Sequence, residues 1–335
     1  MANNELEKVL ASIRKQYGEE VIRKASMSPQ VKRIPTGSLV MDWLTGGGFP
    51  IGRWVHGYGG YASAKTLTAW HAIKEAQKMG ISCAYYNIEN QFDPVWAAAR
   101  GIDLDKLQII EVTRIEDVGT IMESLLSVVD FHVVDSIGAA VSADELAGDI
   151  GDWMPGIAAR AWGKALRRAN DRFDNTRNTI FLINHAKDLF GKMGGEEPGG
   201  PKLINFYSSL NLHFRRSSWL FYDKSGILST DGLKTDSLTG DTEPDGMEFV
   251  VRVAKSRVGE PLRVARFRMD FKSGEFDNLW VLAKAADYFQ IADKKGSWYT
   301  LPDGSKVQGE NGLREAIQEN DKFRDSIIKR VMEDT

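Results

Sequence analysis

The sequence predicts an α/β fold in which a mainly parallel sheet is covered by helices on both faces. Three observations carry this prediction. Short apolar runs alternate with helical patterns from about residue 35 to residue 215. One of these runs ends in a glycine-containing loop that opens a helix. The 335 residues are 42% hydrophobic and 27% charged, which is ordinary for a globular protein with a sizeable core.

The elements follow one another in a regular order. Apolar residues recur every three to four positions over 5–24, which predicts an amphipathic helix that packs either on its own core or on another subunit. The main body then alternates strands and helices. The expected strands are 53–58, 82–88, 107–112, 131–137 and 178–185, and the expected helices are 66–80, 94–101, 115–129 and 157–173.

Two segments in the second half of the chain are expected to be loops. One is the glycine-rich 185–202, and the other is the acidic 229–246, a solvated insertion or a hairpin connection. Between and after them, 211–223, 248–258 and 263–271 are expected to extend the sheet as antiparallel strands. A small α/β tail begins near residue 277 and ends in two helices. The domains predicted are therefore an N-terminal helix and linker (1–34), a core (35–276) and a small C-terminal domain (277–335).

Composition excludes several classes of protein. The formal net charge of −3 gives no global basic field, so contacts with nucleic acid must come from local basic segments. The single cysteine, Cys83, excludes an internal disulfide and fits a reducing compartment. No apolar run reaches the roughly 18 residues of a membrane span, and we expect a cytoplasmic protein. The five histidines are scattered, so no zinc site is expected.

The stretch GYGGYASAKT (57–66) resembles a phosphate-binding loop of the pattern G-x-x-x-x-G-K-[ST]. Lys65 would reach the β- and γ-phosphates and Thr66 would hold Mg²⁺, but Ala64 replaces the second glycine. If this position needs a left-handed backbone, alanine costs roughly 1–2 kcal/mol. On its own the match is equally compatible with a glycine-rich turn between a strand and a helix.

Two carboxylates stand at the ends of apolar strands. Asp135 ends FHVVD, where a Walker B carboxylate reaches the Mg²⁺ shell. Glu89 follows CAYYNI, at the carboxyl edge where parallel sheets bind ligands, and can serve as general base for water. Either residue alone is commonly a simple turn residue, but their order after the loop favours a nucleotide site.

These motifs, with several longer segments, resemble the RecA family of DNA recombinases over nearly the whole chain. CAYYNIENQFDPVWAAARGID resembles the segment that carries the catalytic glutamate, and VVDSIGAAVSADELAGDIGDWMPGIAARAWGKALRR resembles the Walker B strand with the first DNA-binding loop. FLINHAKDLFGKMGGEEPGGPKLINFYSSLNLHFRR resembles the sensor strand with the second DNA-binding loop. The resemblance implies a P-loop NTPase core with an N-terminal helix and a small C-terminal domain.

The resemblance also implies roles for individual residues. Glu89 would activate water, and His185 stands where a glutamine usually senses the γ-phosphate. Lys255 and Arg257 match two basic residues that reach the ATP of a neighbouring subunit, and Asp135 with Thr66 would hold the metal. The residues implied in nucleotide binding are Gly59, Gly60, Tyr61, Ala62, Ser63, Ala64, Lys65, Thr66 and Leu67, with Asp93 and Trp96 at the adenine.

The implied DNA contacts come from the loops at 148–156 and 186–205 and from one helix. Arg160 and Arg167 are seven residues apart, so they share a helix face that is either a phosphate-binding stripe or a solvated surface. The first loop is acidic, which by itself argues against DNA there. The residues implied are Arg160, Arg167, Lys187, Lys192, Gly199, Gly200 and Lys202.

We therefore expect a DNA-dependent ATPase that uses ATP and Mg²⁺, forms helical filaments on single-stranded DNA, and exchanges strands with homologous duplex DNA. Ala64, Asn87 in place of a frequent acid and the long 229–246 segment favour a divergent member, such as the UvsX-like recombinases of phages. Two alternatives stay open: a filament that binds ATP and DNA with little or no hydrolysis, and a hexameric P-loop helicase.

Overall fold

The computed structural model describes residues 2–27, 30–149, 156–188, 196–232, 235–236 and 242–334. The chain divides into two compact units, Met1–Lys32 and Arg33–Thr335. The domain boundaries expected at residues 34 and 276 stay predictions.

The first unit holds helix α1 (Ala2–Tyr17) and two short 3₁₀ turns, η1 (Glu19–Val21) and η2 (Ala25–Met27). The helix expected over 5–24 therefore ends earlier than predicted. Gly18 has a φ of 100°, outside the right-handed helical region, and its N–H donates to the carbonyl of Arg14 at 2.8 Å. Docking of this helix on another subunit stays a prediction.

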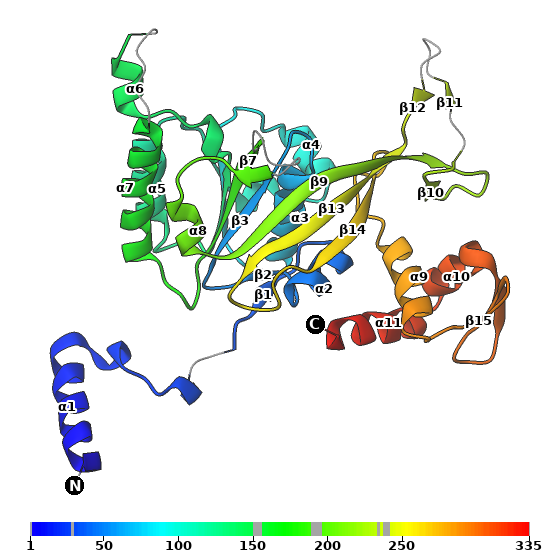
Figure 1. Ribbon diagram of the computed structural model, residues 1–335, viewed down its shortest axis with the longest axis horizontal. Coiled ribbons are helices and arrows are strands. Elements are labelled where there is room, and N and C mark those ends of the chain that lie inside the picture. The colour runs from blue at the N-terminus through cyan, green and yellow to red at the C-terminus, as the bar shows by residue number, and fades with distance from the viewer. Residues whose placement is uncertain are drawn as a thin grey trace. The chain divides into compact units, whose positions relative to one another are not determined.

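The second unit is built on a ten-stranded sheet, which confirms the predicted α/β class. The main path runs in the order β14, β13, β9, β3, β7, β6, β4, β5. Figure 1 labels the strands from β14 to β7. From β3 to β5 the strands of this path are parallel to one another, so their carboxyl ends meet at one edge. They are β3 (Trp54–Gly59), β7 (Thr179–Asp188), β6 (Phe131–Asp135), β4 (Cys83–Asn87) and β5 (Leu107–Ile110).

Three longer strands extend the sheet beyond β3: β9 (Ser208–Tyr222), β13 (Gly246–Ser256) and β14 (Val264–Asp270). The expectation that all three are antiparallel is wrong for β9, which is parallel to β3. The chain returns from β7 through helix α8 (Leu203–Tyr207), and such a crossover restores the strand direction. β13 is antiparallel to both of its neighbours.

The connections that were expected to be loops contain short strands. β8 (Glu196–Pro198) pairs antiparallel with β7, within the segment 185–202. Within 229–246, β11 (Thr235–Asp236) and β12 (Thr242–Glu243) pair antiparallel as a hairpin. At the start of this segment, β10 (Leu228–Ser229) pairs with β9.

Helices cover both faces of the sheet because its strands alternate between two apolar cores. In β7, Phe181 and Ile183 join one core, while Ile180 and Leu182 join the other. Helices α2 (Leu39–Thr45), α3 (Lys65–Lys78) and α4 (Pro94–Ala99) contribute to the first core. Helices α5 (Ile115–Leu125), α7 (Ile157–Arg172) and α8 contribute to the second, beside the short helix α6 (Ala143–Ala147).

The last part of the chain has a core of its own, formed by Leu282, Leu313, Ile317, Phe323 and Ile327 with their neighbours. It contains α9 (Asn278–Tyr288), β15 (Asp293–Lys295), β16 (Trp298–Thr300), β17 (Lys306–Gln308), α10 (Gly309–Glu319) and α11 (Asp321–Glu333).

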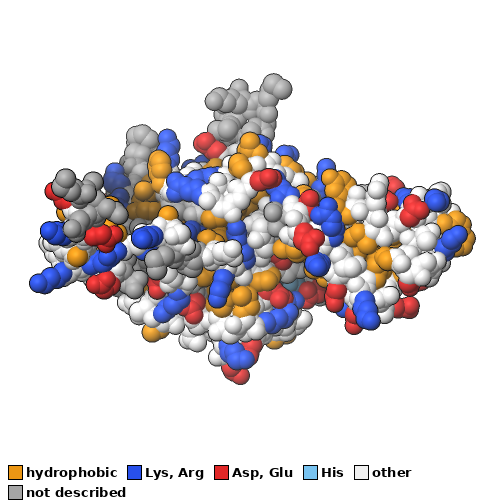
Figure 2. Space-filling view, turned by 90° about the horizontal axis from the view of Figure 1, so that it is seen from below, with side chains coloured by type: hydrophobic (Ala, Val, Ile, Leu, Met, Phe, Trp, Pro, Cys, Tyr) orange, Lys and Arg blue, Asp and Glu red, His pale blue; other side chains and the backbone are white. Residues whose placement is uncertain are grey.

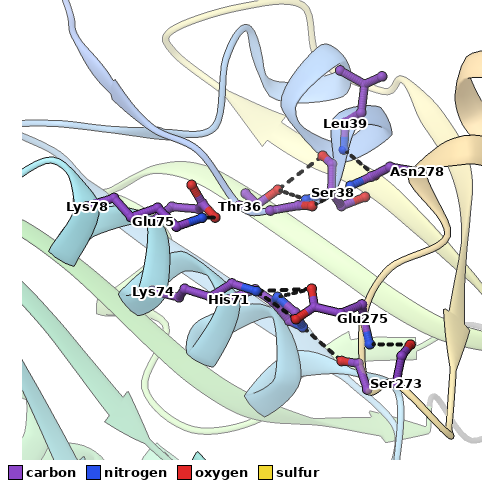
Figure 3. Close-up of polar contacts among 12 residues, drawn as sticks. Thr36, Ser38, Leu39, His71, Lys74, Glu75, Lys78, Ser273, Glu275 and Asn278 are labelled. Carbon is purple, nitrogen blue, oxygen red and sulfur yellow. Dashed lines mark hydrogen bonds and ion pairs between the residues drawn. The ribbon is translucent and has the colours of Figure 1, made fainter. Parts of the chain in front are cut away.

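Polar contacts tie α2 and α3 to the connection between β14 and α9 (Figure 3). Lys74 Nζ lies 2.8 Å from Glu275 Oε1, and His71 Nδ1 lies 3.5 Å from the other oxygen of the same carboxylate. The N–H of Leu39 donates to Asn278 Oδ1 at 2.9 Å. Helix α3 is thereby held by these polar contacts as well as by the apolar core.

The described surface carries both signs of charge. On the face drawn in Figure 2, Lys and Arg side chains are interspersed with Asp and Glu rather than forming one continuous basic field. None of the described helices is long and apolar enough to cross a membrane.

Candidate nucleotide and DNA site

The loop after β3 has the geometry of a phosphate-binding loop and opens directly into α3. Ala64 is the N-cap of this helix and has φ 69° and ψ 18°, in the left-handed region. A Cβ on Gly59 would lie 2.1 Å from the carbonyl oxygen of Phe214, so that position admits only glycine. Residue 64 thus has the left-handed conformation that the glycine of the usual pattern adopts without strain. Alanine adopts the same conformation at a cost of roughly 1–2 kcal/mol.

Lys65 lies folded back over this loop. Its Nζ donates to the carbonyl oxygens of Gly59 at 3.0 Å and Gly60 at 2.8 Å, and lies 3.3 Å from Ser63 Oγ. Burial lowers the pKa of the Lys65 ammonium from its ordinary value, while the negative charge of Asp135 acts in the opposite sense. The ammonium group is thus held beside the helix N-terminus, where an anionic ligand is favoured.

Thr66 and Asp135, predicted as metal ligands from segments 69 positions apart, lie in direct contact. Thr66 Oγ1 donates to Asp135 Oδ2 at 2.7 Å, and the hydroxyl of Tyr85 donates to the same oxygen at 2.7 Å. Burial is the largest cause that raises the pKa of Asp135, against the lowering effect of these two hydrogen bonds. Tyr85 was not predicted. It lies in β4, two residues before the end of the strand, and it meets Asp135 only because β4 pairs with β6.

The Thr66 hydroxyl and the Asp135 carboxylate suit Mg²⁺. This ion is usually bound by one or two carboxylates and other oxygen ligands and keeps several of its waters. Among the described residues no cluster of three or more His, Cys, Asp or Glu side chains forms another candidate metal site. Thr66 and Asp135 therefore fit the predicted metal position.

Glu89 lies at the same edge of the sheet, next to His185. The distance between His185 Nε2 and Glu89 Oε1 is 3.3 Å, and Ser136 Oγ donates to the same carboxylate oxygen. The structure thus brings together the predicted base and the predicted sensor, which are 96 positions apart in sequence. Ser136 was missed because a serine after a Walker B aspartate carries no distinctive signal.

A hollow of about 680 Å³ opens beside the phosphate-binding loop. Its walls combine the segment 62–67 and Trp96 with apolar side chains of the extension strands. Asp93 caps α4 through hydrogen bonds from the N–H groups of Val95 and Trp96, which fixes the start of this helix. Met269 and Phe271 also line the hollow. They were missed because the alternation of apolar and polar residues in 263–271 predicts a strand but does not show which part of the fold its apolar face meets.

Lys255 and Arg257 lie away from the predicted phosphate-binding loop, toward the amino end of the sheet. Lys255 pairs with Asn211, which in turn pairs with His56, three residues before Gly59 in β3. At about 3.3 Å per residue, the Lys255 backbone is offset along the strands by roughly 10 Å from the loop end, toward the amino edge. The N–H of Arg257 is further along in the same direction, bonded to the carbonyl of Ser209.

Both of these cations bind carbonyls near α8. Lys255 Nζ donates to the carbonyls of Asn205 and Ser208, the latter at 2.8 Å, and Arg257 Nη1 donates to that of Phe206 at 3.0 Å. Burial, followed by the charge of Arg257, lowers the pKa of Lys255. Neither side chain is directed to the phosphate-binding loop of its own chain.

The predicted arginines of α7 are exposed and share one face. Arg168 and Arg172 pair with Glu123, whereas Arg160 and Arg167 make no ion pair within the part of the chain that the structure describes. Arg160 lines a hollow of about 440 Å³ between α5 and α7. Two unpaired guanidinium groups on one helix face are available to a phosphate backbone.

The second predicted DNA segment is gathered around another hollow, of about 320 Å³. Its walls include Lys187, Gly199, Gly200 and Lys202. It meets the sensor strand directly, since the N–H of Gly199 donates to the carbonyl of His185 at 2.9 Å. Lys192 and most of the first loop, 150–155, lie outside the described residues.

Asn184 and the pair formed by Glu196 and His213 were also missed. Asn184 Nδ2 donates to the carbonyl of Gly199 at 2.7 Å, so β7 and the glycine segment are joined by side chain as well as backbone. Glu196 Oε2 lies 2.5 Å from His213 Nε2, and the His213 ring stacks on Tyr58 at 4.8 Å, just before the phosphate-binding loop. The two hydrogen bonds join residues 15 and 17 positions apart, whereas the ring stack joins segments far apart in sequence.

Comparison with known proteins adds independent evidence. Residues 4–275 match the RecA N-terminal domain family. The chain is 33% identical to Protein RecA of Chlamydia felis, with 98% of this chain and 91% of that protein covered. It is 31% identical to Protein RecA of Lactobacillus delbrueckii subsp. bulgaricus (97% and 95% covered) and 32% identical to Protein RecA of Arthrospira platensis (97% and 86% covered). The fold, the site at the carboxyl edge of the sheet and these similarities agree, and the chain belongs to the RecA family.

Proposed function

We propose that this chain binds ATP with Mg²⁺ at residues 59–67 and that each site is completed by Lys255 and Arg257 of a second copy. As a member of the RecA family, the chain is a DNA-dependent ATPase and recombinase that forms ATP-dependent filaments on DNA. The observation that carries the site assignment is the contact of Thr66 with Asp135 at 2.7 Å, beside Glu89 and His185.

Glu89 is suited to orient and deprotonate the attacking water. Its carboxylate is hydrogen-bonded by Ser136 and faced by His185, so it is held at the edge where α3 presents free N–H groups. Mg²⁺, held through Thr66 and Asp135, supplies charge neutralisation for the phosphates when bound. Lys65 has only to turn from the carbonyls of its own loop to the phosphates.

The second copy follows from the position of the two cations. Lys255 and Arg257 lie toward the amino edge of their own sheet, so their own nucleotide is out of reach. In a head-to-tail assembly that edge meets the carboxyl edge of the next copy, and such an interface generates open helical filaments. There the cations would stabilise charge in the transition state, as arginine fingers do.

His185 provides a path from the nucleotide to DNA. Its side chain faces Glu89, and its backbone carbonyl accepts the N–H of Gly199 in the predicted DNA segment. Arg160, Arg167, Lys187 and Lys202 would bind the phosphates of single-stranded DNA, so affinity should fall as salt rises. Pairing with homologous duplex DNA and a cytoplasmic location are part of the same proposal.

The two alternatives are less well supported. A filament that hardly hydrolyses ATP was suggested by Ala64, but the loop keeps its left-handed geometry and Glu89 is in place. A hexameric helicase shares the core fold, but the similarity to Protein RecA extends over 98% of the chain, including the C-terminal part.

The test is ATP hydrolysis with and without single-stranded DNA, for the unaltered protein, Lys65→Ala and Glu89→Gln. We expect DNA-stimulated turnover that both substitutions abolish, with ATP binding lost only in Lys65→Ala. ATP-dependent DNA binding without turnover in the unaltered protein would instead support the non-hydrolysing filament. Exposed Glu111→Gln, outside the site, is the matched carboxylate control.

A further inference from the structure

The hollow beside the phosphate-binding loop has an unexpected aromatic wall. Trp219, on β9, is 51% exposed although it is a large apolar side chain, and it faces the same hollow as Trp96 (46% exposed) and Phe271 (41% exposed). Exposed aromatic groups that share a cavity with polar loops are typical of ligand sites. The same hollow is bounded by Lys65 and Thr66, so the wall is continuous with the phosphate-binding end.

A β-bulge places Trp219 on this wall. Trp219 pairs with Met247 and Arg216 pairs with Phe249, so Ser217 and Ser218 together oppose the single residue between them on β13. The extra residue shifts the alternation of β9, and Trp219 falls on the same face of the sheet as Arg216 instead of the opposite one. Bulges commonly re-aim a side chain next to an active site.

The bulge is fixed from the other face of the sheet. Arg266 Nη1 donates to Ser217 Oγ at 2.8 Å and to Glu248 Oε1 at 2.9 Å. Glu248 is buried and is also bonded by Arg268 at 3.2 Å. This network holds Ser217, a residue of the bulge, on the polar face of the sheet, opposite the face that carries Trp219.

We propose that Trp219 is a base-contacting residue of the nucleotide site and forms the wall opposite Trp96. This inference rests on the proposed function, because the phosphates must occupy the loop for the base to enter the hollow. A nucleoside base is flat and π-faced, and a tryptophan ring stacks on it regardless of which base is present. The side chain therefore contributes affinity for the nucleoside part of the ligand and none for the polyphosphate.

The experiment compares ATP with inorganic triphosphate, both with Mg²⁺ and without DNA, by titration calorimetry on the full chain. Trp219→Ala should weaken ATP binding roughly tenfold, a typical loss for one base–aromatic stack, and leave triphosphate binding unchanged. Trp219→Phe should retain most of the ATP affinity, because an aromatic face remains. Trp298→Ala is the matched control, since Trp298 is similarly exposed (47%) but lies on β16.

The outcomes separate the two claims. If the unaltered protein binds both ligands and Trp219→Ala binds ATP as tightly as before, this inference fails and the proposed function stands. Equal weakening of ATP and triphosphate in Trp219→Ala also overturns it, because the change then acts through the loop. If the unaltered protein binds neither ligand, the proposed function fails together with the inference.

Discussion

The two ends of the central sheet hold cationic groups of the same kind in different surroundings. At the carboxyl edge, burial lowers the pKa of Lys65, while the charges of Asp135, Glu89 and Glu196 act in the opposite sense. At the amino edge, burial also lowers the pKa of Lys255, and the neighbouring Arg257 guanidinium lowers it further. Both lysines donate to backbone carbonyls of their own chain. The carboxyl edge therefore holds the predicted phosphate site, whereas the cations toward the amino edge lie away from it.

The difference indicates how work is divided between copies of the chain. On the proposed function, a site assembled from two edges would be inactive until two molecules meet, so hydrolysis would be confined to the filament. The parallel strands are consistent with this division, because their carboxyl ends, where loops and helix N-termini converge, all lie at one edge. The following predictions test each edge and the sheet between them, from the largest expected effect to the smallest.

The largest effect is expected at the amino edge. The double substitution Lys255→Ala and Arg257→Ala should lower DNA-stimulated hydrolysis by about 10³-fold, the lower end of the range for arginine-finger residues. ATP binding to the isolated chain should be unchanged, because these residues face away from its own loop. Steady-state hydrolysis and calorimetry measure the two quantities, with Lys306→Ala as an exposed-lysine control. A loss of ATP affinity in the isolated chain would show that the cations act within one molecule.

At the carboxyl edge, His185→Ala should lower DNA-stimulated hydrolysis by about 10²-fold, because a donor near the developing charge and the base is lost. His185→Gln keeps an amide donor of similar reach and should retain most of the activity. The comparison of the two variants, at equal protein and DNA, is the measurement. Equal activity of both variants and the unaltered protein would remove His185 from the mechanism.

Between the edges, buried histidines should make the sheet sensitive to acid. His132 lies between the hydroxyl of Tyr86 and the carbonyl of Val129, and burial lowers its pKa to about 4. Because this folded-state pKa is below the unfolded value, its contribution is present above about pH 6.5 and is lost as pH falls toward 4. Between pH 7.5 and pH 5 the loss is about 2 kcal/mol for this one group.

Urea unfolding of the unaltered protein and of His132→Asn at both pH values isolates this contribution from those of other groups. The stability of the unaltered protein should fall by about 2 kcal/mol more than that of the variant. An identical pH dependence in the two proteins would mean that His132 is as easily protonated in the folded state as in the unfolded state.

The smallest effect concerns Ala64. Ala64→Gly removes the cost of a left-handed alanine but adds conformational freedom to the unfolded chain, so a gain of about 0.5–1 kcal/mol in unfolding free energy is expected. Ala72→Gly, in the interior of α3, is the matched control and should be destabilising. A destabilised Ala64→Gly protein would show that the loop does not pay a backbone cost at this position.

Much of this architecture was accessible from the sequence because its signals are local. Strand–helix alternation predicted the parallel sheet, and the lysine and threonine after a short strand predicted the loop at the start of α3. Asp135 and Glu89 were found because each follows an apolar strand that ends at the ligand-binding edge. Local patterns of this kind depend only on neighbouring residues.

The remainder depends on long-range pairing, which no local pattern carries. Tyr85 contacts Asp135 only because β4 pairs with β6, and Trp219 enters the hollow only because of a bulge against β13. The parallel pairing of β9 with β3 depends on a crossover through α8. The sequence showed only that Ala64 would carry a cost if the loop needed a left-handed residue there. That residue 64 does adopt this conformation is known only from the structure.

The most direct test of a nucleotide site shared between copies is a mixture of two inactive proteins. Lys65→Ala lacks the loop lysine but keeps the amino-edge cations, whereas the Lys255→Ala and Arg257→Ala double variant keeps the loop. Mixed in equal amounts on single-stranded DNA, they should recover up to roughly a quarter of the unaltered rate, because random head-to-tail neighbours restore that share of sites. A mixture as inactive as its two components, although both join the filament, would contradict the division of the site between two molecules.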